Sequence, residues 1–140
     1  MACYNSIVIN APADKVWGKI CNFHDLSWAS GVIETCQAVG GIPATQIGAR
    51  RVLNGVFHET LHAIDDLSRT VRYSIDDGPD AVSRDNVQGY IGEVRVFPVT
   101  ENNTSFVVWT SNWESSGSGV AEFCNPIYRA LLSALKKSFA

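Results

Sequence analysis

Glu59 is the residue in this sequence whose neighbours point most directly to chemistry. It lies in the segment 56–64, where apolar and polar residues alternate with the period of a β-strand that has one buried face. The more apolar face of that strand carries Phe57, Glu59, Leu61 and Ala63. A carboxyl group among apolar side chains needs a partner or a raised pKa, and such a group can serve as a general acid or base.

An arginine on the preceding strand is the candidate partner, and the turn at Asn54-Gly55 decides which arginine it is. A two-residue turn would place Arg50 directly opposite Glu59. A three-residue loop with Gly55 in the left-handed conformation would instead place Arg51 on the inner face, diagonal to Glu59. We favour Arg51, because its side of the strand is the more apolar one. The other residues on that side are Ile47, Ala49 and Leu53.

Two interpretations of Glu59 follow. In the first, Glu59 is a general acid or base in a dry pocket, and Arg51 tunes its pKa. In the second, the two residues form a structural ion pair that braces the sheet. Burial would raise the pKa of Glu59 and the arginine would lower it, so the sign of the net shift stays open at this point.

Large aromatic residues on the other strands predict either a ligand pocket or a bulky core. Trp109 and Trp113 alternate with Ser111 along the final strand, and Tyr73 and Tyr90 occupy positions that could face a helix. Their number favours an aromatic-lined cavity, because so many rings pack poorly around one helix without a void. The predicted ligand-binding residues are Phe57, Leu61, Tyr73, Ile75, Trp109, Trp113, Phe123, Ile127 and Leu131.

The elements that must position these residues follow from the periodicity. A β-branched run at 6–10 predicts a first strand, Pro12 begins a helix, and 22–28 continues as a second short helix or turn. A period of two predicts strands near 33–39, 46–53, 56–64, 70–76, 87–99 and 104–114. A last helix carries Phe123, Ile127, Leu131 and Leu135 on one side. Pro126 either begins that helix or kinks a longer one from about Ser118, and we favour the longer helix.

This order of elements predicts one α+β domain over residues 1–140. Its short links favour antiparallel neighbours, so seven strands would form a curved sheet around the long C-terminal helix, with two short helices after the first strand. The space between helix and sheet is either packed solid or an internal hydrophobic cavity that binds a small molecule.

The composition excludes several classes of protein. With 46% apolar and 18% charged residues the chain is not disordered, and no apolar run approaches the length of a membrane span. A net charge of −3 makes nucleic acid a poor partner. The four cysteines form no metal-binding pattern, His58 and His62 lie on the outer face of their strand, and no cofactor motif is present. The N-terminus lacks the pattern of a signal peptide, so we expect a cytoplasmic protein.

The chain resembles the START-like helix-grip superfamily, also called SRPBCC or Bet v 1-like, and within it the polyketide cyclase/dehydrase group. The resemblance covers essentially the whole chain, and its nearest branch holds the plant abscisic-acid receptors and lachrymatory-factor synthase. The residues that carry it are Ile9-Asn10-Ala11-Pro12-Ala13-Asp14-Lys15-Val16-Trp17, Phe23-His24-Asp25-Leu26 with Trp28, Gly48-Ala49-Arg50-Arg51, Glu59-Thr60-Leu61 with Ile64-Asp65-Asp66, and Tyr73-Ser74-Ile75.

Motif by motif, the resemblance implies that the arginine, glutamate and tyrosine of the synthase fall on Arg51, Glu59 and Tyr90. It implies a lyase or isomerase that cyclises, dehydrates or isomerises a small hydrophobic molecule without a cofactor. Arg51 would hold an oxygen of the substrate, Glu59 would transfer a proton to or from the substrate, and Tyr90 would orient it. The alternative is a non-catalytic carrier or sensor of a hydrophobic ligand or lipid. With either function we expect a monomer or homodimer. The short turn at Asn54-Gly55 replaces the gate loop of the receptors, which argues against a hormone receptor.

Overall fold

The computed structural model describes all 140 residues of the chain. Its strands (β), α-helices (α) and 3-10 helices (η) follow one another as β1 (Ala2–Ile9), α1 (Ala13–Ile20), η1 (Ser27–Ala29), β2 (Cys36–Val39), β3 (Arg50–Leu53), β4 (Phe57–Asp65), β5 (Thr70–Asp77), η2 (Asp80–Val82), β6 (Val87–Gln88), β7 (Ile91–Val99), β8 (Thr104–Asn112), β9 (Ser115–Ser116) and α2 (Val120–Lys137). The predicted order of a strand, two short helices, a run of strands and a long helix is therefore confirmed.

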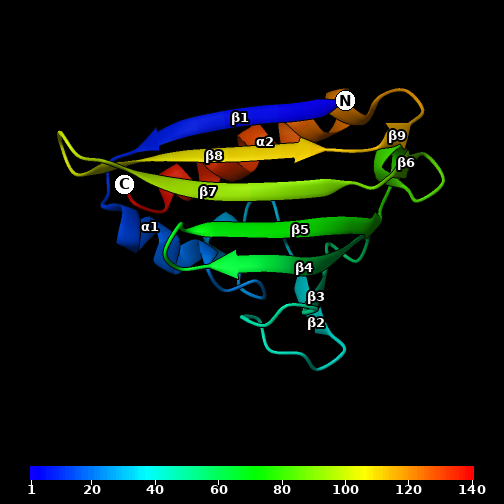
Figure 1. Ribbon diagram of the computed structural model, residues 1–140, viewed down its shortest axis with the longest axis horizontal. Helices are drawn as coiled ribbons and strands as arrows, with labels where there is room; N and C mark the ends of the chain where they lie inside the picture. The colour runs from blue at the N-terminus through cyan, green and yellow to red at the C-terminus, as the bar shows by residue number, and fades with distance from the viewer.

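Seven strands form one antiparallel sheet in the order β1-β8-β7-β5-β4-β3-β2. Figure 1 shows this sheet in front, with α2 running behind β1, β8 and β7 and with α1 at one end. Although β1 is first in the chain, it pairs along its whole length with β8 and packs against α2. The predicted α+β helix-grip fold, with its seven-stranded sheet around the C-terminal helix, is confirmed.

The second and third strands are shorter than the predicted ranges 33–39 and 46–53. The third strand begins only at Arg50, because the loop before it turns at Gly48, whose backbone φ is 95°. Only glycine adopts such a φ without strain. Ile47 was expected on the inner face, but it lies in this loop and is exposed.

The predicted strand 87–99 is in fact two strands. Gly89 separates them with a φ of 70°, and a Cβ at this position would collide with the side chain of Glu114. β6 turns away and pairs with β9 in a separate two-stranded sheet. The break leaves Tyr90 between β6 and β7, with its side chain buried.

A β-bulge in β4 changes which residues face the helix. Regular pairing with β5 breaks after Leu61, and His62 is the extra residue. Side chains beyond the bulge therefore point to the faces opposite those predicted. Ala63 pairs with the exposed Arg72 and does not belong to the inner face, whereas Ile64 packs against the core.

The last helix is the longer of the two that the sequence allowed. It spans 18 residues, it contains Pro126, and Gly119 precedes it with a φ of 89°. Its buried residues are Val120, Cys124, Tyr128, Leu131, Leu132 and Leu135. Phe123 and Ile127, which the sequence placed at the centre of the stripe, are only half-buried at its edge. The centre of the buried face follows the adjacent row of Val120, Cys124, Tyr128 and Leu132, which lies about 100° around the helix from the predicted row.

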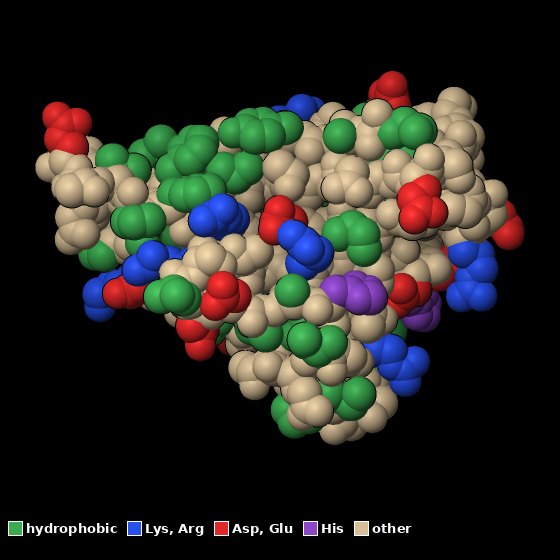
Figure 2. Space-filling view, in the orientation of Figure 1, with side chains coloured by type: hydrophobic (Ala, Val, Ile, Leu, Met, Phe, Trp, Pro, Cys, Tyr) green, Lys and Arg blue, Asp and Glu red, His purple; other side chains and the backbone are tan.

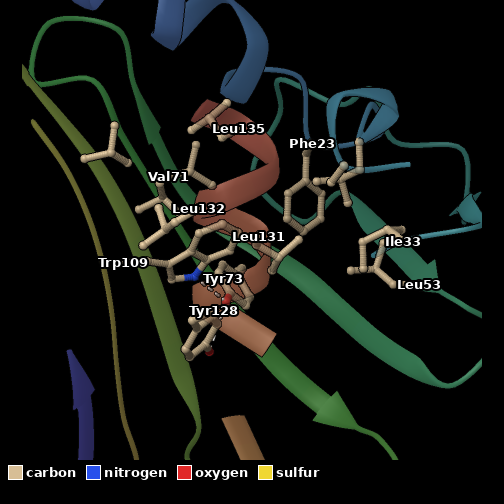
Figure 3. Packing of buried hydrophobic residues seen from close by; sticks show 14 of the residues in the cluster. Phe23, Ile33, Leu53, Val71, Tyr73, Trp109, Tyr128, Leu131, Leu132 and Leu135 are labelled. Carbon is tan, nitrogen blue, oxygen red and sulfur yellow. Dashed lines mark hydrogen bonds between the residues drawn. The ribbon is translucent and has the colours of Figure 1, made fainter. Parts of the chain in front are cut away.

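The hydrophobic core lies between α2 and the inner face of the sheet. In Figure 3, Leu132 and Leu135 of α2 lie close to Val71 of β5 and Trp109 of β8, while Phe23 closes the core from the segment after α1. None of the helices combines the length and the apolar character needed to cross a lipid bilayer.

Candidate active site

Arg51 and Glu59 face each other directly across β3 and β4. The loop between the strands has three residues and Gly55 has a φ of 70°, as expected for the register that favours Arg51. The expected diagonal arrangement is wrong, because pairing Leu53 with Phe57 also pairs Arg51 with Glu59. The two side chains are only 8% and 6% exposed, and Arg51 Nη2 lies 2.7 Å from Glu59 Oε1.

The guanidinium of Arg51 is held on several sides. Its Nε donates to Glu59 Oε1 at 2.8 Å, and its Nη1 donates to the backbone oxygen of Phe23 at 2.9 Å. The ring of Phe23 lies 3.9 Å from the guanidinium carbon, and the ring of Tyr73 lies 5.5 Å from it. A cation fixed by hydrogen bonds and by two aromatic faces is a rigid, pre-positioned charge.

The Glu59 carboxyl uses only one of its oxygens within the protein. Both contacts from Arg51 reach Oε1, and Oε2 accepts no hydrogen bond. Burial raises the pKa of Glu59 above its usual range, the charge and hydrogen bond of Arg51 oppose this, and Asp76 adds to the rise. Because desolvation is the largest of these causes, the carboxyl keeps its proton to a higher pH than an exposed glutamate does.

The cavity beside this pair is small. It has a volume of about 40 Å³ and is lined by Leu26, Ile33, Arg51, Leu53, Phe57, Glu59, Tyr73, Ile75, Trp109, Cys124, Ile127, Tyr128 and Leu131. A pocket for a drug-sized ligand is roughly 300–1,000 Å³. The wide hollow predicted from the aromatic residues is therefore absent, and the space holds only a few non-hydrogen atoms.

The aromatic residues fill the space because their polar groups bond to one another. Trp109 Nε1 donates to Tyr73 Oη at 2.9 Å, and Tyr73 Oη lies 3.3 Å from Tyr128 Oη. Tyr128 Oη also bonds to Tyr90 Oη, which reaches Cys124 Sγ at 3.5 Å. Figure 3 shows Trp109, Tyr73 and Tyr128 converging beside α2. Such a connected network lets several large rings share one core without leaving a void.

Most of the predicted site residues come together at this cavity. Those that line it are Arg51, Glu59, Phe57, Tyr73, Ile75, Trp109, Ile127 and Leu131. The predicted residues that do not line it are Leu61, Tyr90, Trp113 and Phe123.

These four residues lie elsewhere for different reasons. Leu61 is fully buried in the core. The strand break at Gly89 draws Tyr90 toward the start of α2, where its ring stacks on that of Trp113 with centroids 5.7 Å apart. Phe123 packs against Phe57 at the edge of the helix.

Five of the lining residues were not predicted from the sequence. They are Leu26, Ile33, Leu53, Cys124 and Tyr128. Cys124 and Tyr128 follow Val120 at spacings of four, so a stripe counted from the first residue of α2 would have found them. Leu26 and Ile33 lie in loops around η1, where no periodicity signals burial.

The outer face of β4 is separate from this site. His58 and His62 are exposed there, and His62 Nε2 lies 2.8 Å from Ser74 Oγ. Figure 2 shows this face of the sheet as a mixture of charged, polar and apolar side chains. No three His, Cys, Asp or Glu side chains of the chain lie close enough together to hold a metal ion.

Comparison with known proteins gives one family and several similar structures. A sequence profile described as "Polyketide cyclase / dehydrase and lipid transport" matches residues 3–140. A search of curated proteins finds no match. A solved structure from Nitrosospira multiformis is 44% identical, covers 100% of this chain and 97% of its own, and superposes with a TM-score of 0.97.

Two Bacillus proteins are more distant. The protein XoxI from Bacillus cereus is 26% identical, with 99% of this chain and 94% of that chain covered and a TM-score of 0.81. A protein from Bacillus thuringiensis has the same TM-score of 0.81 at 24% identity, with 99% and 98% of the two chains covered. At that identity the likeness concerns the fold alone.

Proposed function

Because the chain belongs to the polyketide cyclase/dehydrase and lipid transport family, we propose that it binds a small, largely apolar molecule between the sheet and α2 and that Glu59 moves a proton of that molecule. One observation carries the proposal: Glu59 is buried with Arg51 at a cavity whose other lining residues are hydrophobic, and Arg51 bonds only its Oε1, which leaves Oε2 for a ligand. A fully structural ion pair would be expected to engage both carboxylate oxygens.

The arrangement suits acid–base chemistry that needs no cofactor. With its raised pKa, Glu59 can donate a proton from Oε2 to a ligand oxygen and later take one back from carbon or water. Arg51 stabilises the carboxylate that forms and carries further N–H groups that can hold a ligand oxygen. Positioned proton transfer of this kind supplies about 10²–10⁴-fold in rate. Cyclisation, dehydration and isomerisation are the reaction types that such a pair supports.

Tyr90 acts through Tyr128 in this proposal. Tyr128 lines the cavity and bonds to Tyr90 behind it. Tyr90 is therefore proposed as a positioning residue that orients the Tyr128 hydroxyl, in place of the direct contact with substrate that the sequence resemblance implied.

Ligand binding requires the cavity to widen. Phe57 and Ile127 line it and are only half-buried, so they are the side chains that can move with least loss of packing. A ligand that binds the wider conformation shifts the population toward it.

A non-catalytic carrier or sensor is the second candidate. It is favoured by the bonds that Arg51 already makes within the protein, to Glu59 and to the backbone oxygen of Phe23. In this version Arg51 and Glu59 only neutralise each other and form hydrogen bonds to the polar end of the ligand.

Native mass spectrometry and one substitution test the proposal. Wild-type protein exposed to a metabolite extract should retain a small molecule, which mass spectrometry identifies and which then serves in a turnover assay. Glu59→Gln should bind that molecule and fail to convert it. Equal turnover by wild type and Glu59→Gln would reject the proton-transfer role of Glu59. If wild type binds the molecule without converting it, the protein is a carrier or sensor instead.

A further inference from the structure

The hydrogen bonds among the buried tyrosines run in one direction. Their chain begins at Trp109, whose indole N–H can only donate and gives its hydrogen to Tyr73 Oη at 2.9 Å (Figure 3). The chain ends at Cys124, whose sulfur accepts from the Tyr90 hydroxyl at 3.5 Å. Because each hydroxyl has a single hydrogen to give, a chain that is fixed at both ends also fixes the bonds between them.

Counting the hydrogens assigns the donor in each inner bond. The hydrogen of Tyr90 goes to the sulfur, so Tyr128 donates in the bond between Tyr128 and Tyr90. The hydrogen of Tyr128 is then used as well, so Tyr73 donates in the bond of 3.3 Å between Tyr73 and Tyr128. All three hydroxyl hydrogens are therefore used within the protein.

The pKa shifts of the tyrosines have the signs that this direction requires. A hydrogen bond donated to a phenol oxygen lowers its pKa, because the bond stabilises the anion, whereas a bond that the phenol itself donates raises the pKa. Burial is the main cause that raises the pKa of Tyr128, the bond from Tyr73 opposes the rise, and the bond to Tyr90 adds to it. Burial also raises the pKa of Tyr73, the bond to Tyr128 adds to the rise, and the bond from Trp109 opposes it.

The tyrosine side of the cavity can therefore accept hydrogen bonds but has no hydroxyl hydrogen to donate. Tyr73 and Tyr128 line the cavity, and Tyr90 does not. Each of the two lining oxygens accepts one hydrogen bond from the protein and can accept another. The Cys124 S–H, which also lines the cavity, is only a weak donor. A ligand group that donates a hydrogen bond fits this side better than one that only accepts.

We propose that Tyr73 and Tyr128 select a neutral ligand that carries a hydrogen-bond donor, such as the hydroxyl group of an apolar alcohol, on this side of the cavity. The inference rests on the proposed function, because the ligand has to enter the cavity. A ligand hydroxyl meets a free acceptor there, whereas a ketone or ether oxygen meets two oxygens whose hydrogens are already used. A charged donor is disfavoured, because it would lose its hydration in these apolar surroundings.

Two small ring compounds test this selectivity in the wild-type protein. Cyclopentanol can donate a hydrogen bond, whereas cyclopentanone can only accept one. Nuclear magnetic resonance titration measures the dissociation constant of each compound. Cyclopentanol should bind roughly fivefold more tightly than cyclopentanone, because it gains one neutral hydrogen bond that the ketone cannot form. Equal or tighter binding of cyclopentanone would overturn the selectivity.

Tyr90→Phe tests the direction of the chain from outside the cavity. Without the Tyr90 oxygen the hydrogen of Tyr128 is released, and a ligand oxygen is a better acceptor for it than the Cys124 sulfur. Cyclopentanone should therefore bind roughly fivefold more tightly to Tyr90→Phe than to wild type, while cyclopentanol binding changes by less than about twofold. Tyr4→Phe is the matched control, because it removes an exposed hydroxyl and should change neither affinity. An unchanged ratio of the two affinities in Tyr90→Phe would overturn the direction of the chain and with it the selectivity.

The outcomes separate this inference from the proposed function. If both compounds bind wild type equally, or if Tyr90→Phe keeps the wild-type ratio, the selectivity fails and ligand binding stands. If neither compound nor any metabolite binds wild type, the proposed function fails, and the selectivity, which depends on it, is overturned as well. If Tyr90→Phe does not fold, the comparison of the two compounds in wild type decides alone.

Discussion

Gly92 of β7 lies directly opposite Tyr73 of β5, and the Tyr73 ring covers the place where a Cβ on Gly92 would lie. Tyr73 lines the cavity, accepts the hydrogen bond of Trp109 and lies near Arg51. The absence of a side chain at Gly92 therefore sets the position of the central ring of the site.

Gly92→Ala should lower the free energy of unfolding by about 1–3 kcal/mol, because the added methyl group forces the Tyr73 ring out of its place. Urea denaturation measures the change. Gly18→Ala is the control, since nothing lies within 4 Å of a Cβ there and the residue is in α1. Alanine favours the helix, so the control should be neutral or stabilising by up to about 1 kcal/mol. A Gly92→Ala variant as stable as wild type would show that Tyr73 is free to move.

Arg51→Met should destabilise the protein by about 3–5 kcal/mol, because it leaves the buried carboxyl of Glu59 without its partner. Arg50→Met removes the neighbouring exposed arginine and should change stability by no more than about 0.5 kcal/mol. The double variant Arg51→Met with Glu59→Leu should recover most of the loss, since no unpaired charge remains. Equal effects of the two arginine substitutions in urea denaturation would contradict the ion pair.

The stability of wild type relative to Glu59→Gln should fall as the pH rises above 4.5, the usual pKa of a glutamate. The folded-state pKa of Glu59 is raised, mainly by burial. The folded protein therefore binds the proton more tightly than the unfolded chain, and it loses this advantage as the pH rises through the folded-state pKa. Parallel urea titrations of both proteins measure the difference. A relative stability that instead grows with pH would show that the attraction of Arg51 outweighs desolvation.

Tyr128→Phe should cost about 1–3 kcal/mol of stability, because it removes the hydroxyl that links Tyr73 to Tyr90. The fluorescence of Trp109 should change as well, since Tyr128 packs against its ring with centroids 5.4 Å apart. Tyr4→Phe is the matched control, because Tyr4 is exposed on β1 and should leave both properties unchanged. A Tyr128→Phe variant indistinguishable from this control would show that the network adds nothing to stability.

Local patterns in the sequence were sufficient for the order of elements and for the position of Glu59. The alternation in β4 placed Glu59 on the buried face, and the apolar residues around Arg51 favoured it over Arg50 as the partner, which the register of β3 and β4 confirms. These features depend on periods of two, which are readable over a few residues. The predicted orientation of Ala63 was wrong, because a bulge interrupts that same alternation and nothing in the neighbouring residues signals the bulge.

Features that depend on several segments far apart in the chain could not be predicted from such local patterns. Tyr128 lines the site although it lies 69 positions after Glu59 in the chain. The volume of the cavity depends on how rings from β5, β8 and α2 interlock through their hydroxyl and indole groups.

The sequence by itself determined a curved antiparallel sheet, a long closing helix and a carboxyl group held away from water, because each of these follows from the spacing of apolar residues along one element. Only the tertiary structure decided that the carboxyl keeps one oxygen free, that Tyr90 stands behind Tyr128, and that the space between them is narrow. Packing and hydrogen-bond direction are properties of side chains that meet from different elements, and no single segment contains them.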